Sequence, residues 1–590
     1  MLRHWPLSQL SDDGTVLELE HHSLDSAPRY IALSYTWGQA FYRGDRSPSA
    51  TYSVTLSGSA FPVQENLHDA LTYLAWRVRK KGCLFWVDAI CINQTDPEER
   101  SSQVAQMRHI YDHAFSVYVW LELPCDEEET RLAVEMMEKC SQRMDDDFKA
   151  NNNQLLYATS LKLAERDSET APEPGTERYR AWLGITNMFN DRPYWRRSWI
   201  YQEATGPAHT CYFCGGHSFG AHMISSALAM SIYFMNHPNL DSELCFGIFI
   251  SGARDVDGFR RNGNFYNGAA LLTLLNAIRP TSCTDPRDKV YAVRGMAEDL
   301  GAGDVVPDYS RSVEAVYTDV ARFSLSQPSD GLNIFGHVVF PPADSTLMGC
   351  MHDGPRIPTW TPDWRDILGV RPFSERLNGQ SGYYTLDTDE KAYRAHGPNP
   401  THNAHVEGAS LKLDGYYVDR VSTVLPMWEQ DWQDMRVVKS WAPSNGDKLY
   451  CPTGQTFGLA FRTTIVADIQ LDGRSRGNAV RWDLLHKKTD RLGPDEVACR
   501  TNTLYPLLCT CSYRRLCWTA KGYMGIAPAA TQADDIVCIF FGGQVPHILR
   551  DAGEGHYKLI GECYIHGIMD GEAFEGPDFD PVNLKTFILD

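Results

Sequence analysis

The pattern of apolar and polar positions predicts alternating strands and helices in the first part of the chain. Residues 30–37 form an apolar run of the kind that makes a buried strand. Between residues 65 and 81, apolar side chains recur at helical spacing, and Gly82 follows as a C-cap. The runs at residues 84–90 and 116–123 predict two further buried strands.

The helix between the second and third strands has a well-marked start. Asp96 is an N-cap, Pro97 takes the first helical position, and Glu99 completes a capping box. The predicted inward face consists of apolar residues at helical spacing: Val104, Met107, Ile110, Tyr111 and Ala114. Strands separated by helices in this way are typical of α/β folds, so we expect a mostly parallel sheet flanked by helices.

The character of the chain changes after this region. Residues 145–177 are polar with few large apolar side chains, which predicts a mobile insertion within a first domain of residues 1–225. Helical patterns dominate residues 226–327, and short β-type runs with Gly and Pro between them dominate residues 328–590. We therefore expect a helical middle region followed by a β-rich C-terminal domain.

Composition and charge argue against several kinds of partner. The 590 residues include 75 Asp and Glu against 55 Lys and Arg, a formal charge of −20. Such a chain repels the phosphate backbone, so we expect no nucleic-acid partner. The N-terminus lacks the apolar core of a signal peptide and the apolar runs are too short to cross a bilayer, so we expect no membrane association and a cytoplasmic location. The 16 Cys lie in apolar surroundings typical of reduced core cysteines.

Three blocks of the sequence resemble the signature blocks of the fungal heterokaryon incompatibility (HET) domain family. In the family's order they are YIALSYTWG at residues 30–38, FWVDAICINQTDPEERSSQVAQMRHIYDHAFSVYVWL at residues 85–121, and RPYWRRSWIYQEA at residues 192–204. The middle block alone is too long for a chance match. Stretches between residues 284 and 574 also resemble the downstream part of long family members.

Two positions depart from the family's pattern. The family usually has Gly after VWL, where this chain has Glu122, and TQADD at residues 531–535 replaces a more typical Gly-Asp turn. Glu122 brings a carboxylate to the C-terminal end of a sheet strand, where α/β proteins bind ligands, so we expect it to alter the site. The second departure is expected to affect only a loop.

HET domains are also similar to Toll/interleukin-receptor (TIR) domains, several of which cleave NAD. The resemblance implies a TIR-like sheet and a catalytic Glu four residues after a Trp, which matches Glu203 and Trp199. On a helix this spacing sets both side chains on one face. By this resemblance, Glu203 stabilises the positive charge that develops as the bond between ribose and nicotinamide breaks.

Candidate substrate-binding residues come from the end of the first strand and from two arginines. Ser34, Tyr35 and Trp37 end that strand, and aromatic rings there offer surfaces for nicotinamide or adenine. Arg100 or Arg197 is suited to the pyrophosphate. NAD enters as a candidate substrate, and no cofactor is expected.

A further candidate set lies where the second strand runs into a loop, the usual place for ligand contacts in such sheets: Asp88, Asn93 and Gln94. Asn and Asp side chains also organise turns, and this scaffold role is the interpretation that we favour for the set. Glu203 has a similar alternative, as a helix-face carboxylate paired with Arg196 or Arg197.

Other motifs carry less weight. GHSFG at residues 216–220 fits the G-x-S-x-G pattern of hydrolases, but so short a pattern is not specific. His209, Cys211, Cys214 and His217 have zinc-like spacing without a second pair at finger distance, and HGIMDGE at residues 566–572 is interpreted as a structural turn. We therefore expect no metal site. Neither a Walker loop nor a Rossmann glycine fingerprint is present.

Three functions stay open, and the sequence does not decide whether the protein is an enzyme. The first is a cell-death effector in nonself recognition that hydrolyses NAD or a related nucleotide and depends on self-association or an activating protein. The second is a HET-scaffold enzyme of fungal secondary metabolism that performs a cofactor-independent cyclisation of an apolar substrate, an idea motivated by 15 Trp and 28 Tyr. The third is a catalytically silent interaction module.

Overall fold

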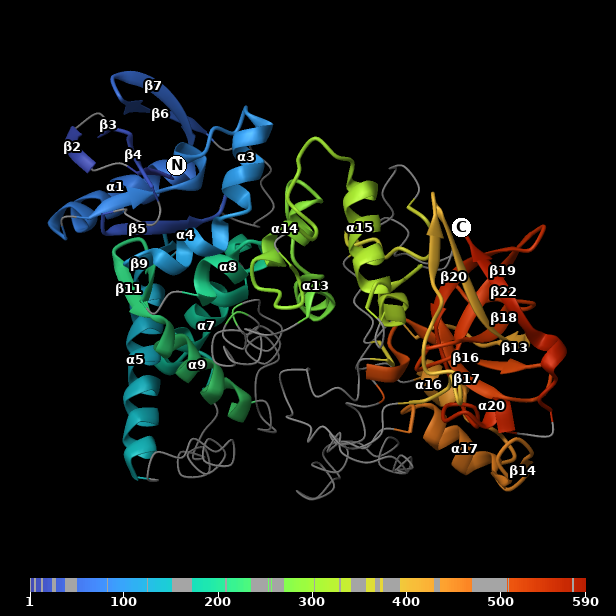
Figure 1. Ribbon diagram of the computed structural model, residues 1–590. Helices are drawn as coiled ribbons and strands as arrows, with labels where there is room; N and C mark the ends of the chain where they lie inside the picture. Colours follow the sequence, from blue (N-terminus) through green and yellow to red (C-terminus); the bar gives the residue numbers. More distant parts are fainter. Residues whose placement is uncertain are drawn as a thin grey trace. The chain divides into compact units, whose positions relative to one another are not determined.

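The structure is a computed structural model that describes residues 2–4, 7–11, 14–23, 28–37, 50–81, 83–124, 126–150, 172–190, 192–206, 209–234, 253, 256, 270–301, 303–327, 331–340, 357–366, 372–374, 393–428, 436–468, 507, 509–575 and 578–590. The chain divides into two compact units (Figure 1). The first unit comprises Met1–Ala302 and Val306–Ser310, and the second comprises Gly303–Val305 and Arg311–Asp590. The predicted three-part division of the chain stays a prediction.

A five-stranded sheet with the order β11-β10-β9-β5-β8 forms the centre of the first unit. Its strands are β5 (Tyr30–Tyr35), β8 (Leu84–Trp86), β9 (Ser116–Trp120), β10 (Thr210–Cys214) and β11 (His217–Gly220). Four strands are parallel, and β11 alone runs antiparallel, beside β10. Every residue of β5 and β9 is buried, as in parallel strands covered on both faces. The mostly parallel α/β sheet is confirmed, whereas its TIR-like character stays a prediction.

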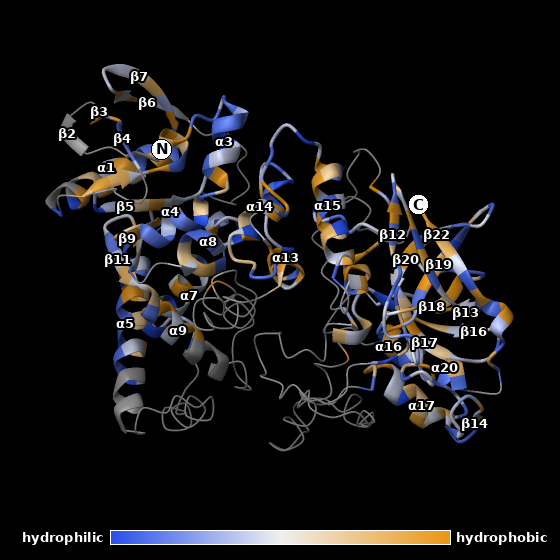
Figure 2. Ribbon diagram, viewed as in Figure 1, coloured by the Kyte–Doolittle hydropathy of each residue, from blue (hydrophilic) through white to orange (hydrophobic). Residues whose placement is uncertain are grey.

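Helices surround this sheet, and two smaller sheets lie near the N-terminus. The helices are α1 (Glu65–Lys80), α3 (Pro97–Val104), α4 (Met107–His113), α5 (Glu127–Ala150), α7 (Glu177–Asn190), α8 (Ile200–Thr205), α9 (Ala221–Phe234), α13 (Leu271–Ile278) and α14 (Asp288–Arg294). One small sheet pairs β1 (Leu2–His4) with β4 (Glu20–His22), and the other contains β2 (Leu7–Ser11), β3 (Gly14–Leu17), β6 (Thr51–Leu56) and β7 (Ser59–Gln64). Figure 2 shows α3 as mostly hydrophilic and α13 as mostly hydrophobic, which agrees with the four buried aliphatic residues of α13.

The predicted helix start at Asp96 is confirmed in its main feature. The Asp96 side chain accepts hydrogen bonds from the backbone N–H groups of Glu98 and Glu99, and Pro97 takes the first helical position. The capping-box part of the prediction is wrong, because the Glu99 carboxylate accepts from the N–H of Asn93 at 3.1 Å. Glu99 thus ties the helix to the loop that precedes it.

Two elements are shorter than the pattern predicts. The strand expected over residues 84–90 ends at Trp86, and a short helix, α2 (Asp88–Cys91), follows. The Asp88 carboxylate accepts from the N–H of Ala89 at 2.7 Å, which is the kind of local bond that competes with a strand ladder. The helix after Pro97 breaks between α3 and α4, although the predicted inward residues Met107, Ile110 and Tyr111 are all buried.

The predicted insertion is described only in part. Residues 145–150 belong to the end of α5, and residues 172–176 lead into α7. Residues 151–171 lie outside the described residues, so their expected mobility stays a prediction.

A nine-stranded sheet dominates the second unit, which confirms the β-rich C-terminal region. Its strands are β12 (His405–Glu407), β13 (Ser410–Val424), β16 (Arg514–Thr519), β17 (Met524–Pro528), β18 (Ile536–Phe540), β19 (His547–Gly553), β20 (His556–Glu562), β21 (Tyr564–Ile565) and β22 (Leu584–Leu589). The long strand β13 pairs with β22 through residues 411–416 and with β18 through residues 415–420. Because β18, β19, β20 and β22 are themselves neighbours, these pairings close a ring of strands.

The helices of the second unit are α15 (Val313–Leu325), α16 (Arg436–Ser440), α17 (Phe457–Thr464) and α20 (Glu572–Glu575) among the described residues. None of the helices described in either unit combines the length and the apolar character needed to cross a membrane.

Asp534, in the turn before β18, is a non-glycine residue with φ of +70°. Residues with a Cβ are strained in this left-handed conformation and Gly is not, so Asp534→Gly should raise the free energy of unfolding by about 0.5–1 kcal/mol. The neighbouring Ala533 does not have positive φ, and Ala533→Gly should lower it by a similar amount. Thermal unfolding midpoints of both variants test this, and equal shifts in one direction would contradict it.

Candidate functional site

Glu203 lies inside the first unit, against the end of β5. Its Oε2 accepts from the Ser34 hydroxyl at 2.5 Å and from Arg197 Nη1 at 3.0 Å. Arg197 Nη2 donates to the other carboxylate oxygen at 3.3 Å, so the ion pair is bidentate. Glu203 is only 1 % exposed. Of the two arginines that were expected as partners, Arg197 is the one that pairs with Glu203.

Asp88 lies close to this pair and forms its more accessible side. The half-buried carboxylate accepts from the Trp37 indole N–H at 3.0 Å and from the Tyr35 hydroxyl. The Trp37 side chain is 46 % exposed, whereas Tyr35 is buried. We call Ser34, Tyr35, Trp37, Asp88, Tyr194, Arg197 and Glu203 the carboxylate site. Trp37, Asp88 and Arg197 are the members that are not fully buried.

The two carboxyl groups differ in their surroundings. Burial raises the pKa of Asp88 to about 6, the negative charge of Glu203 adds to the rise, and Arg197 opposes it. Burial also raises the pKa of Tyr35 and Tyr194 well above the usual value, so both hydroxyls stay protonated and can donate hydrogen bonds. A pair of acids with unlike environments is the arrangement by which enzymes separate acid and base roles.

Tyr194 supports the site from the third signature block. Its hydroxyl lies 2.8 Å from the Ser34 hydroxyl, which in turn bonds Glu203. The sequence analysis missed Tyr194 as a site residue. Tyr194 lies in the block RPYWRRSWIYQEA, two residues after Arg192, and this position is the sequence signal that could have identified it.

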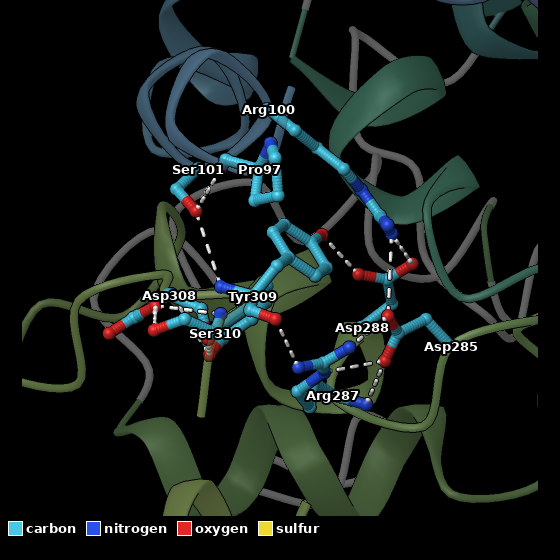
Figure 3. Close-up of polar contacts among 10 residues, drawn as sticks. Pro97, Arg100, Ser101, Asp285, Arg287, Asp288, Asp308, Tyr309 and Ser310 are labelled. Carbon is cyan, nitrogen blue, oxygen red and sulfur yellow. Dashed lines mark hydrogen bonds and ion pairs between the residues drawn. The ribbon is translucent and has the colours of Figure 1, made fainter. Parts of the chain in front are cut away.

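Arg100 belongs to a second group of side chains, which we call the Asp288 cluster (Figure 3). Its members are Arg100, Asp285, Arg287, Asp288 and Tyr309. Arg100 lies 3.5 Å from Asp285 and 3.9 Å from Asp288, and its guanidinium stacks 3.6 Å from the centre of the Tyr309 ring. The Trp199 side chain lies near Asp288 and opposes the rise that burial causes in the pKa of that carboxyl. Trp199 and Glu203 thus have different neighbours, although the Glu203 N–H bonds the Trp199 carbonyl at 3.2 Å.

Asn93 and Gln94 support the loop after α2. The Asn93 side-chain oxygen accepts from the backbone N–H of Thr95 at 3.2 Å and from its hydroxyl at 2.8 Å. The Gln94 amide donates to the Asp88 carbonyl at 3.2 Å. These contacts agree with the scaffold role that we favoured for both side chains.

Glu122 follows β9 with φ of +81°, a conformation that Gly adopts at no steric cost. This gives a physical reason for the Gly that the family usually has there. The side chain is buried, and its Oε2 lies 3.4 Å from Arg192. Arg192 also donates to the carbonyls of Leu121 and Leu123 at 2.5 and 3.0 Å. Burial raises the pKa of Glu122 to about 8 despite Arg192.

The remaining motifs have structural surroundings. Ser218 lies within β11, opposite Phe213 of the β10–β11 hairpin, and not at a strand-to-helix elbow. His217 bonds Glu127 at 3.0 Å, and His566 bonds Tyr564 and Gln455 at 3.0 and 2.9 Å. No group of three or more His, Cys, Asp or Glu is arranged to hold a metal ion in the described parts of the chain.

The raised pKa of Glu122 predicts a pH-dependent loss of stability. The folded protein keeps this carboxyl protonated up to about pH 8, whereas the unfolded chain releases the proton near pH 4.5. Stability therefore falls as pH rises between these values, and Glu122→Gln should remove that loss. The advantage of the variant should grow by about 1.4 kcal/mol per pH unit between pH 5.5 and 7.5.

Thermal unfolding across this pH range measures the effect. Glu128→Gln is the control. Arg131 lowers the pKa of the exposed Glu128, so this carboxyl is ionised throughout the range in both the folded and the unfolded protein. A constant difference between wild type and Glu122→Gln would show that Glu122 is ionised in the folded protein.

Comparisons with known proteins agree with this architecture. Residues 30–203 match the family model described as Heterokaryon incompatibility protein (HET), and residues 486–578 match the Het-6 beta-barrel domain. Over 92 % of its length the chain is 23 % identical to Heterokaryon incompatibility protein 6, OR allele, of Neurospora crassa, 90 % of which is covered. No solved structure matches the chain. The carboxylate site lies within the first match, so this part of the chain is similar to HET domains, and the C-terminal part is similar to the Het-6 beta-barrel domain.

Proposed function

We propose that this protein is a cell-death effector of nonself recognition whose HET domain hydrolyses NAD or a related nucleotide at the carboxylate site. The HET match and the similarity to Heterokaryon incompatibility protein 6 support the biological role. One observation carries the chemical part. A half-buried carboxyl with a raised pKa, Asp88, bonds the exposed Trp37 and lies beside the Arg197–Glu203 ion pair.

The exposed Trp37 and the half-buried Asp88 suit the two groups that the scissile bond joins, nicotinamide and ribose. The Trp37 ring offers a face on which nicotinamide or adenine stacks. Ionised Asp88 stabilises the positive charge that develops at ribose C1′ as nicotinamide leaves. Water then adds to C1′, so that NAD and water give ADP-ribose, nicotinamide and one proton.

The burial of Glu203 assigns it a different part in this reaction from the one that the TIR resemblance implies. At 1 % exposure it lies behind Asp88, where it holds Arg197 and adds to the raised pKa of Asp88. Asp88 is therefore the carboxylate that meets the ligand, and Glu203 sets its charge and surroundings. We also propose a cytoplasmic location and a requirement for self-association or an activating protein.

A catalytically silent interaction module is the second candidate, and the same burial favours it. Both Glu203 oxygens are satisfied by Arg197 and Ser34, as in many structural ion-pair networks. In this case the site stabilises the fold, and a surface of the protein performs recognition. The cyclisation of an apolar substrate stays a prediction that nothing in the described residues favours over these two.

Nicotinamide release from NAD by the full-length protein tests the hydrolase. Asp88→Asn should lower the rate about 100-fold or more, because the amide cannot supply the negative charge. The wild-type rate should rise with pH through about 6, since Asp88 must be ionised to act and its pKa lies there.

Glu128→Gln, which alters an exposed carboxylate on α5, is the matched control and should keep the wild-type rate. The assay covers a wide range of protein concentrations so that self-association can occur. Wild type without nicotinamide release at the highest concentration, or full activity in Asp88→Asn, removes the hydrolase.

Growth arrest on overexpression in a fungal host distinguishes the effector enzyme from the interaction module. If hydrolysis kills, Asp88→Asn should abolish toxicity at equal protein level. Toxicity retained by Asp88→Asn would favour the silent module, and harmless wild-type protein would count against both as cell-death effectors.

A further inference from the structure

We infer that a segment beyond the matched HET residues positions the Arg197–Glu203 pair and belongs to the functional domain. The segment, residues 279–295 together with Tyr309, is called the clamp. Its members lie in the first compact unit, yet the HET match ends at residue 203. The effect of the clamp on catalysis rests on the proposed hydrolase, whereas its effect on geometry does not.

The first element of the clamp is a β-bridge that encloses Arg197. Arg197 faces Ser282 in a parallel bridge. The Ser282 N–H donates to the Arg196 carbonyl at 2.5 Å, and the Ser198 N–H donates to the Ser282 carbonyl at 3.1 Å. The Ser198 hydroxyl also lies 2.6 Å from that of Thr281. Because both neighbours of Arg197 are held, its backbone cannot shift without breaking these bonds.

The second element is the carboxylate of Asp288, which is buried. It accepts from the Tyr309 hydroxyl at 2.5 Å, and the nearby Trp199 side chain favours its charged form. The Trp199 carbonyl in turn accepts from the N–H groups of Gln202 and Glu203 at 3.0 and 3.2 Å, which forms the first turn of α8. Holding Trp199 therefore holds the turn that carries Glu203.

The third element is the contact between α14 and α8, which lie side by side (Figure 1). The Gln202 amide donates to the Tyr291 carbonyl at 3.2 Å. A side chain on Gly295 would place its Cβ 2.7 Å from that of Arg108, so the close packing of this region requires Gly. The clamp therefore also holds Gln202, the residue before Glu203.

The clamp is braced by contacts within itself and is joined to α3. Buried Lys289 of α14 donates to the carbonyls of Arg279 and Thr281 at 2.8 and 2.5 Å, which links these two residues to α14. On the other side Arg100 of α3 reaches the cluster, and the Tyr309 N–H donates to the Ser101 hydroxyl at 3.2 Å (Figure 3). The clamp therefore joins the second signature block to the third.

Asp288 is the positioning residue that we test, because it lies beside Trp199 at the start of α8 and belongs to α14, the helix that packs against α8. Amide hydrogen exchange of the full-length protein tests this directly. Asp288→Ala should raise exchange over residues 196–204 about tenfold or more, since the first turn of α8 loses its anchor. Asp285→Asn is the matched control: it alters an acid of the same cluster that bonds Arg100 and Arg287, and exchange there should stay within about twofold of wild type.

Trp199→Phe provides a milder test of the contact between Trp199 and Asp288, because it removes the polar N–H near the carboxylate and keeps an aromatic ring. It should raise exchange over residues 196–204 in the same direction, and it replaces Asp288→Ala as the deciding variant if that protein fails to fold. Unchanged exchange in the deciding variant overturns the inference, whatever the activity.

Kinetics separates positioning from general weakening of the fold. Asp288→Ala should lower kcat about tenfold with KM unchanged, because Trp37 and Asp88 still bind the ligand while Arg197 and Glu203 are less well placed. An equal loss in Asp285→Asn would show a merely structural role. Wild-type protein without activity removes the proposed hydrolase, and the exchange measurement then still decides whether the clamp holds α8.

Discussion

The ion pair between Arg197 and Glu203 is the constraint around which the first unit is arranged. Removing a guanidinium and a carboxylate from water costs several kcal/mol for each ion unless their hydrogen bonds are replaced. Here the supporting contacts come from segments far apart in the sequence: Ser34 of β5 donates to Glu203, Tyr194 bonds Ser34, and the bridge to Ser282 holds the backbone of Arg197. Any shift of one segment leaves a buried charge unpaired, so the pair fixes the sheet, α8 and the clamp together.

Features with a local cause were predictable from the sequence. The burial of β5, the apolar face of α1 and the cap at Asp96 all follow from side chains within a few residues of one another. The strand that ends early at Trp86 was not predictable from its apolar run, because the Asp88 carboxylate favours a turn there. The positive φ of Glu122 was not predictable either, because this conformation usually indicates Gly and the residue here is Glu.

The site was predictable in its membership more than in its geometry. The resemblance pointed to Glu203, and their positions at strand ends pointed to Asp88 and the end of β5; the structure places these residues in contact or close by. The resemblance gave no indication that Glu203 is buried or that Trp199 turns to Asp288. Those facts depend on residues far away in the sequence, such as Ser34, which lies 169 positions before Glu203, and neither periodicity nor spacing carries information about such pairings.

If the protein is the proposed hydrolase, the burial of Glu203 bears on how its activity is restrained. If Asp88 alone meets the substrate, the site is competent as it stands. If Glu203 must also reach the ligand, the ion pair with Arg197 has to open, and breaking a buried pair costs about 3–5 kcal/mol. An open state of that energy is populated by roughly one molecule in several hundred or fewer. A partner that binds only the open state then supplies the difference, and the same ion pair that organises the fold acts as the restraint on its chemistry.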